Sequence, residues 1–390
     1  MADDTVRAVA RRGHLGSLSL SQILIAEVAL FAVIAAATQG VVPALVATVL
    51  AAGLLAAALT RRQNRWWLEH HALTRDHRRR RAARRQADEG PVLAALRTIA
   101  PGLTVTDISG KSPHEETGIA RDEAGWFGVV ALDPQAPVPL EALVSTMTAT
   151  DQPGVILELV THTVPAPSTD LPPASPAGAS YRQLLGSTPT PAHRESSISV
   201  RLDAKALAES VLDHTADLTS AAALTAALTR KTATALRRLG IPGRVLVAEE
   251  LLELLARSCD VEPAALAETG KADGSGVAES WTHWRSGRLI HRTYWLETWP
   301  NSVTEIGPLF AWAATAPAAQ TTVALILDPT GDDVAVRAFI RLATRPDADL
   351  DALDRVLLAG VRRAGGELRP LDGEHGPATY ATAPTGGGAG

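Results

Sequence analysis

Two consecutive apolar runs near the N-terminus constrain the fold of this 390-residue sequence more than any other feature. The first run, Leu18–Thr38, holds 21 residues and one charge, Glu27. The second, Val41–Leu59, holds 19 residues and no charge. A helix needs roughly 20 apolar residues to cross a membrane, and only Gln39 and Gly40 separate the runs. The sequence therefore predicts an antiparallel transmembrane hairpin over residues 18–60.

Arginines on both sides of the hairpin predict its orientation. Arg7, Arg11 and Arg12 lie in a basic N-terminal segment, residues 1–17, and ten more arginines follow between Arg61 and Arg85. The connecting loop has no charge, so the positive-inside rule places both ends in the cytoplasm. We expect a multi-pass protein of the cell inner (plasma) membrane. A cleaved signal peptide is the alternative, but the second run and the arginines behind it oppose export.

Charge is divided unevenly between the two parts of the chain. The first 88 residues carry 13 basic and 6 acidic residues, whereas the remainder carries 24 basic and 36 acidic residues. An acidic domain is not expected to have nucleic acid as its main partner. The chain has one cysteine, Cys259, which excludes an intrachain disulfide and a cysteine-based zinc site.

Glu27 is the unusual residue of the first apolar run. A charge in the middle of a membrane helix costs on the order of 3 kcal/mol, so the side chain should be protonated, hydrogen-bonded or turned towards a protein partner. A proton or substrate path is one interpretation, and a contact between helices is the other. Because the second run offers no acid or base as a relay partner, the sequence favours the contact.

Residues 61–88 predict a basic juxtamembrane helix that continues the second apolar run, because they contain neither proline nor glycine. Gly90 is the first helix-breaking residue after them. Trp66 and Trp67 fall where an interfacial aromatic belt would lie. The distal arginines could contact anionic lipid headgroups, an acidic protein surface or only solvent, and these three readings stay open. The distal arginines are Arg78, Arg79, Arg80, Arg81, Arg84 and Arg85.

Residues 89–380 alternate between strand and helix patterns, which predicts a mixed α/β cytosolic domain. Alternating apolar residues predict strand pairs over Trp281–Pro300, turning at Ser286 and Gly287, and over Thr321–Asp328 with Val334–Thr344. A stretch rich in proline, serine and alanine at about 165–192 predicts a flexible insertion. The glycine-rich end, residues 381–390, predicts a disordered tail.

No catalytic motif emerges from the search for chemistry. The sequence has no phosphate-binding P-loop, no nucleophile elbow and no His-Glu-x-x-His pair, so it predicts no catalytic residue, no cofactor and no metal. Asp347, Asp349 and Asp351 are the one suggestive acidic cluster. They could hold a divalent cation beneath a nucleotide sugar, or they could complement the dipole at the start of the last long helix. The pattern favours the second interpretation.

The aromatic stretch Trp281–Pro300 allows a ligand-stacking hypothesis. Trp295 and Trp299 are four residues apart, which places them on one face of a regular strand, and Tyr294 falls on the other face. Such alternation is more typical of a face packed in a core.

Taken together, these features resemble the EccE family of the actinobacterial type VII (ESX) secretion machinery. The resemblance is carried by the two apolar runs, by RWWLEHHALTRDHRRRR at 65–81, by GIARDEAGWFGVVALD at 118–133 and by WTHWRSGRLIHRTYWLETWP at 281–300. It implies a glycosyltransferase-like α/β domain without established activity. It also implies a scaffold subunit that assembles in the membrane with EccB, EccC (the ATPase) and EccD types.

Two functions follow as hypotheses. The first is a non-catalytic structural subunit of an inner-membrane protein transport complex, stabilising its assembly through the hairpin and the cytosolic domain. The second, from the acidic cluster and the aromatic stretch, is a membrane-tethered, nucleotide-sugar-dependent glycosyltransferase that uses Asp349 and Asp351.

Overall fold

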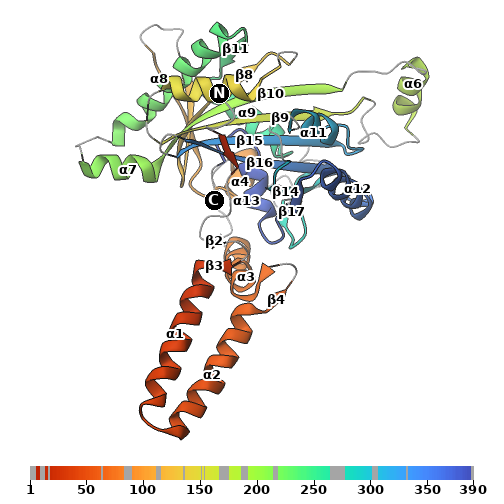
Figure 1. Cartoon of the computed structure of the whole chain (residues 1–390). Helices are drawn as coiled ribbons and strands as arrows, with labels where there is room; N and C mark the ends of the chain where they lie inside the picture. Colours follow the sequence, from red (N-terminus) through yellow and green to blue (C-terminus); the bar gives the residue numbers. More distant parts are fainter. Residues whose placement is uncertain are drawn as a thin grey trace. The chain divides into compact units, whose positions relative to one another are not determined.

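The computed structural model describes most of the chain in two compact units (Figure 1). The sheet unit comprises residues 1–8 and 84–390, and the hairpin unit comprises residues 9–83. The described residues are 6–8, 14–15, 18–62, 65–82, 90–110, 116–134, 137–150, 152, 154–166, 175–185, 192–213, 218–263, 277–300, 306–330 and 333–387.

Two antiparallel helices, α1 (Leu20–Ala37) and α2 (Val41–Leu59), form the body of the hairpin unit. Both are rich in alanine and leucine, which favour helix. The chain reverses at Gly40, whose φ of 129° suits a residue without a Cβ. The unit also holds β2 (His14–Leu15) paired with β3 (Leu18–Ser19), β4 (Arg61–Arg62) paired with β5 (Arg65–Trp66), and α3 (Trp67–Ala82).

The prediction of a transmembrane hairpin is wrong. The runs of 21 and 19 residues expected at 18–38 and 41–59 become helices of 18 and 19 residues. Across the described part of the chain, no helix combines the length and the apolar character that crossing a membrane requires. The multi-pass topology derived from that hairpin therefore has no support in the fold.

The basic stem is also organised differently from the expected continuous helix. Helix α2 ends at Leu59 because Thr60 takes an extended conformation, with φ −71° and ψ 130°. The short β4–β5 pair follows, and helix resumes only at Trp67.

A single 13-stranded sheet forms the sheet unit (Figure 1). Its main order is β12-β13-β14-β16-β15-β9-β10-β8-β7-β6, with β1 beside β16, β11 beside β8 and β17 beside β14. The strands are β1 (Val6–Ala8), β6 (Thr104–Ile108), β7 (Thr117–Asp122), β8 (Gly125–Leu132), β9 (Val155–Val164), β10 (His193–Asp203), β11 (Gly243–Val245), β12 (Ala278–Glu279), β13 (Trp284–Arg285), β14 (Ile290–Thr298), β15 (Gln320–Thr330), β16 (Asp333–Thr344) and β17 (Glu367–Pro370).

The glycosyltransferase-like fold is contradicted by the direction of these strands. A domain in which crossing helices link successive strands is built on a mostly parallel sheet. Here every pairing between described strands is antiparallel except β1 with β16. The fold is a large antiparallel sheet with helices packed against it.

The two predicted strand pairs are confirmed. β15 and β16 are antiparallel neighbours, with Thr322 opposite Arg341, and β13 and β14 pair next to them. Within the expected flexible insertion, the structure describes a helix, α6 (Pro176–Leu185).

The sheet carries an apolar core on each face. Alternation along β8 places Trp126, Val130 and Leu132 in one core, while Phe127 and Val129 belong to the other. The first core packs against α5 (Leu140–Thr150), α7 (Ala204–Asp213), α8 (Leu218–Arg238), α11 (Ile306–Ala313) and α12 (Leu350–Arg363). The second packs against α4 (Pro91–Arg97), α9 (Ala248–Ser258) and the region of α13 (His375–Ala381).

The C-terminal segment differs from the expected disordered tail. Ala383 and Thr385 are fully buried, and Gly386 and Gly387 take positive φ angles of 78° and 69°. A Cβ on Gly386 would lie 2.5 Å from Cβ of Arg201, so the segment can pack this closely only because the residue is glycine.

Candidate functional site

In the hairpin unit, the described hydrogen bond between the two long helices is made by Gln22 and not by Glu27. The Gln22 side chain is buried, and its Nε2 donates to the carbonyl oxygen of Ala58 over 2.9 Å. Glu27 is exposed on α1. A contact of Glu27 with a partner subunit therefore stays a prediction.

Large apolar side chains cover the outside of both helices. Phe31 is 70% exposed on α1 and Val41 is 77% exposed on α2. Contiguous exposure of this kind marks a surface that contacts another protein or lipid. Other members of the surface are Leu24, Val28, Leu30 and Ile34 on α1, and Leu45, Val49, Leu50 and Leu54 on α2.

The predicted basic site is only partly visible. Trp66 ends β5 and Trp67 begins α3, and Arg78 is exposed on that helix. Arg79, Arg80 and Arg81 lie on the same helix, whereas Arg84 and Arg85 lie outside the described residues. Whether this stretch meets lipid or protein stays a prediction.

The acidic cluster caps a helix instead of gathering around one point. The Asp349 carboxylate accepts a hydrogen bond from the Ala352 N–H, 2.9 Å away, as the N-cap of α12. Asp347 pairs with Arg345, which lowers the pKa of Asp347, and Asp351 lies 3.4 Å from Arg292. Throughout the described residues, no three His, Cys, Asp or Glu side chains are grouped so that they could hold a metal ion.

The aromatic stretch belongs to the cores of the sheet unit. Tyr294 is fully buried and its hydroxyl donates to Asp354, while Arg369 stacks 4.9 Å above the ring of Trp295. The predicted shared face of Trp295 and Trp299 is wrong. A register shift between Leu296 and Thr298 interrupts the alternation, so Trp299 packs with the core of the opposite face.

A layer of buried charged and polar side chains crosses the middle of the sheet on the face of α9 and α13. We call it the polar layer, and it consists of Glu158, His162, Arg201, His291 and Arg341. The register sets these residues on neighbouring strands, since Thr322 on β15 lies opposite both His162 and Arg341.

Glu158 anchors the C-terminal segment. Its Oε2 accepts N–H groups from Thr385 (3.0 Å), Gly386 (2.6 Å) and Gly387 (3.1 Å), and the Ser199 hydroxyl lies 3.3 Å away. Complete burial raises the pKa of Glu158 to about 8, although the three N–H groups favour the ionised form. At neutral pH this carboxyl is therefore mainly protonated.

Arg201 makes the second connection to that segment. Its two terminal nitrogens pair with both oxygens of Asp122 at 2.7 and 2.6 Å, and its Nε donates to the Thr385 carbonyl at 2.6 Å. The Tyr380 hydroxyl adds a hydrogen bond of 2.9 Å to Asp122. A bidentate pair of this kind fixes both side chains in one geometry.

His162 lies between two hydroxyls. Its Nε2 is 2.8 Å from Ser258 Oγ, and its Nδ1 is 2.7 Å from Thr322 Oγ1. A serine next to an imidazole resembles an activated nucleophile. Burial and the nearby Arg341, however, lower the pKa of His162 to about 3, so at neutral pH the imidazole is too weak a base to take the serine proton. The hydrogen bonds of His162 join β9 to α9 and to β15.

Arg341 and His291 complete the polar layer. Arg341 donates to the carbonyl oxygens of Ser258 (2.7 Å) and Thr379 (3.2 Å), which joins α9 and α13 to the sheet. His291 lies 3.0 Å from Ser286 Oγ, and burial lowers its pKa. Most polar atoms of these side chains are hydrogen-bonded, whereas Glu158 Oε1, His291 Nδ1 and Arg341 Nε have no partner within the described structure.

The polar layer was not predicted from the sequence, although the spacing of ionisable residues in two strands indicates it. Glu158 and His162 are four residues apart in an otherwise apolar strand, and so are Arg337 and Arg341. In a strand that spacing puts two charges on one face. A charge repeated on one face of an apolar strand indicates a polar layer on that face.

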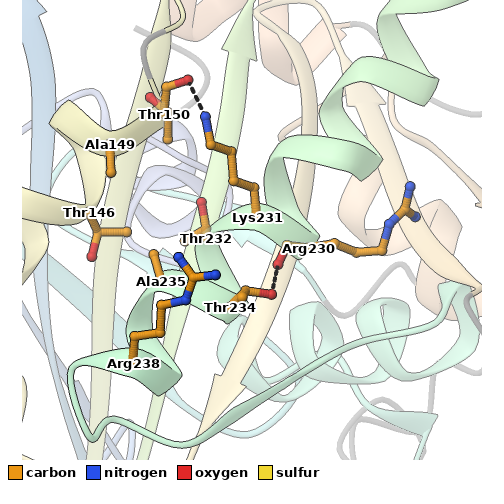
Figure 2. Close-up of a pocket in the computed structure, with 9 residues that line it drawn as sticks. All are labelled: Thr146, Ala149, Thr150, Arg230, Lys231, Thr232, Thr234, Ala235 and Arg238. Carbon is orange, nitrogen blue, oxygen red and sulfur yellow. Dashed lines mark hydrogen bonds between the residues drawn. The ribbon is translucent and has the colours of Figure 1, made fainter.

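Two surface hollows of the sheet unit are lined by described residues. One, of about 490 Å³, includes His162 and two ion pairs, Arg257 with Glu195 and Arg288 with Asp260, both at 3.0 Å. The other, of about 530 Å³, lies between α5 and α8 (Figure 2). We call it the cationic pocket. It is lined by Thr146, Ala149, Thr150, Arg230, Lys231, Thr232, Thr234, Ala235 and Arg238.

Comparison with known proteins supports the family resemblance. Residues 190–296 match the family EccE, described as a putative type VII ESX secretion system translocon. The matched region runs from just before β10 to within β14, and it includes α8, α9 and the aromatic stretch as far as Leu296. No curated protein matches the chain. The resemblance to EccE is thus confirmed over this region.

Proposed function

We propose, from the premise that this chain is an EccE-family component of a type VII secretion system, that it works as a non-catalytic structural subunit of the membrane-bound complex. The observation that carries the proposal is the position of the family match. Residues 190–296 supply β10, α8, α9 and most of β14, which contribute to both cores and to the polar layer. Strands β10 and β14 each have neighbours on both sides in the sheet, so the matched region belongs to the interior of the fold.

The chemistry of the buried groups supports a structural role. His162 has a pKa of about 3 at its site, and the Arg201 guanidinium is engaged by Asp122 and Thr385. Groups held in this way fix the positions of α9, α13 and the C-terminal segment. The positions of the acidic residues do not support the glycosyltransferase alternative, because Asp349 caps α12 and Asp351 faces Arg292.

We further propose that the hairpin unit provides the association with the inner membrane. Exposed apolar side chains on α1 and α2 lose their contact with water when they meet lipid or an apolar partner helix. The arginines of α3 suit anionic headgroups on the cytoplasmic side. EccB, EccC and EccD types are the partners that the family suggests.

Purification from native membranes tests the proposal. We expect the full chain to co-purify with other membrane subunits of a type VII system. A combined Arg78→Gln, Arg79→Gln, Arg80→Gln and Arg81→Gln variant should lower that recovery if α3 contacts protein. Lys205→Gln, a change on α7 in the sheet unit, serves as the control. A chain recovered alone in mild detergent would contradict the proposal.

A further inference from the structure

We infer that the cationic pocket between α5 and α8 binds a phosphate group of a small molecule, a role that goes beyond the structural function proposed above. The nine residues that line the pocket include three cations, three threonines besides the buried Thr232, and no acid. Its volume of about 530 Å³ falls in the range typical of small-molecule sites.

The composition of α8 concentrates positive charge at this place. Helix α8 has no acid in its 21 residues, and its four cations all lie in its C-terminal half. Arg230, Lys231 and Arg238 line the pocket, whereas Arg237 does not. Arg237 and Arg238 in the last turn also complement the helix dipole. The helix dipole does not explain the presence of Arg230 and Lys231, because they lie two turns before the end of the helix.

The cations differ in how much hydrogen-bonding capacity they have left. Lys231 donates from Nζ to the Thr150 carbonyl over 3.0 Å, which leaves two N–H groups, and Arg230 donates to Thr117 over 2.8 Å. Figure 2 shows Lys231 turned towards Thr150, and the Arg238 guanidinium turned back towards Thr232. Among the described residues, Arg238 has no hydrogen-bond partner.

Thr232 supplies the observation that points to a ligand. Thr225, Thr229 and Thr234 on the same helix each donate to the carbonyl four residues earlier. Thr232 is fully buried, lines the pocket, and its Oγ1 has no partner within the described structure. A buried hydroxyl without a hydrogen-bond partner is destabilising. A ligand oxygen that reached the Thr232 hydroxyl would satisfy it.

These groups match a phosphate better than a carboxylate. A phosphate offers three acceptor oxygens, and the pocket presents an arginine fork, an ammonium group and a hydroxyl in one place. The ordinary ion pairs of the other hollow, in which Arg257 and Arg288 each face an acid, are absent from the residues that line this one.

Calorimetric titration of the full chain in mild detergent tests the inference. The probes are inorganic phosphate and a nucleoside diphosphate, each at constant ionic strength set with chloride. We expect saturable binding of at least one probe. Arg238→Gln should weaken it about tenfold or more, since hydrogen bonds between charged groups are lost. Arg237→Gln removes the same charge from the same turn and should leave the affinity unchanged.

The Thr232→Val variant distinguishes a site with specific hydrogen bonds from nonspecific electrostatic binding. The substitution keeps the shape and every charge but removes the hydroxyl, so binding should weaken several-fold. Equal affinities of the Arg237→Gln and Arg238→Gln variants would overturn the inference, and so would the absence of saturable binding by both probes. Unfolding midpoints of the variants, measured without ligand, show that each is folded. Tighter binding of the diphosphate than of phosphate would identify a phosphoester as the ligand class.

Discussion

Two buried titratable residues on β9 respond to pH in opposite directions. Glu158 holds its proton up to a pKa of about 8, while in the unfolded chain it loses the proton near 4.5. The pKa of His162 is about 3 in the folded chain, so the imidazole becomes protonated only in strong acid, whereas in the unfolded chain its pKa is near 6.5. Stability depends on which state binds more protons. We therefore expect Glu158 and His162 to change the stability of the sheet unit with opposite slopes as the pH rises.

For Glu158, the folded state binds one more proton than the unfolded state between about pH 4.5 and 8. Stability therefore falls as the pH rises through that window. We expect Glu158→Gln to remove this decline, so that the variant loses less stability than the parent between pH 5 and pH 8. Urea midpoints at both pH values measure the difference. Ser199→Ala keeps the carboxyl and should retain the decline; a parallel response of Glu158→Gln and parent would contradict the assignment.

His162 contributes the opposite slope. Between about pH 6.5 and 3 only the unfolded chain takes up the proton, so stability is lost as the pH falls through that window. We expect His162→Gln to flatten the acid side of the profile, although it lowers stability at neutral pH by loosening Ser258 and Thr322. Thermal midpoints from pH 7 down to pH 4 test this. Ser258→Ala, which keeps the imidazole, should retain the acid loss, and an unchanged slope in His162→Gln would refute the prediction.

At the scale of elements, the last described residues, Thr385–Gly387, form an ordered strap, and residues 388–390 of the predicted tail lie outside the described part of the chain. The segment from Thr385 to Gly387 has backbone hydrogen bonds to Glu158 and Arg201, although only Thr385 in it has a side chain to pack. Alternation of apolar residues predicted β15 with β16 and β13 with β14, because each strand pair is local. The place of Trp299 was not predictable, since the register shift depends on the pairing of β14 with β17.

Gly386→Ala tests the strap. The residue has a φ of 78°, and a Cβ would lie 2.5 Å from Cβ of Arg201. We expect a loss of about 1–3 kcal/mol in the free energy of unfolding, from the left-handed backbone and from overpacking. Denaturant unfolding measures it.

Alanine substitutions at two other glycines distinguish the cost of the left-handed backbone from the cost of overpacking. Gly365→Ala has a similar φ of 80° with nothing near its Cβ, so it should cost only the backbone part. Gly307→Ala lies in α11 with open space and ordinary helical geometry, so it should be neutral or stabilising. If Gly386→Ala cost no more than Gly365→Ala, the close packing of the strap against Arg201 would be refuted.

For the whole molecule, the sequence predicted the positions of individual helices and strands better than their arrangement in the fold. The positions of the two apolar helices and of the strand pair β15 and β16 followed from local sequence patterns, within two residues at each end. The order of thirteen strands did not follow, because antiparallel neighbours such as β9 and β15 are far apart in the sequence. The transmembrane assignment rested on hydropathy alone, which does not distinguish a membrane helix from an apolar helix that packs on a partner.

Both cores should be needed for the sheet unit to fold. Leu157 and Leu255 are fully buried on opposite faces of the sheet, so Leu157→Ala and Leu255→Ala should each cost about 2–5 kcal/mol. Chemical unfolding followed by tryptophan fluorescence measures the loss. Val356→Ala, at a 56% exposed position of α12, should change stability little. A two-step transition in either core variant would show that the faces unfold separately.

The route of the chain gives the hairpin unit an unusual mechanical setting. Residues 1–8 and residues 84–390 belong to the same sheet unit, so the hairpin unit is inserted into it and joined by two covalent connections. The first connection ends in β1, which pairs in parallel with β16 through only three residues. A pull on the hairpin unit would be shared by both connections, and the three-residue strand would detach first.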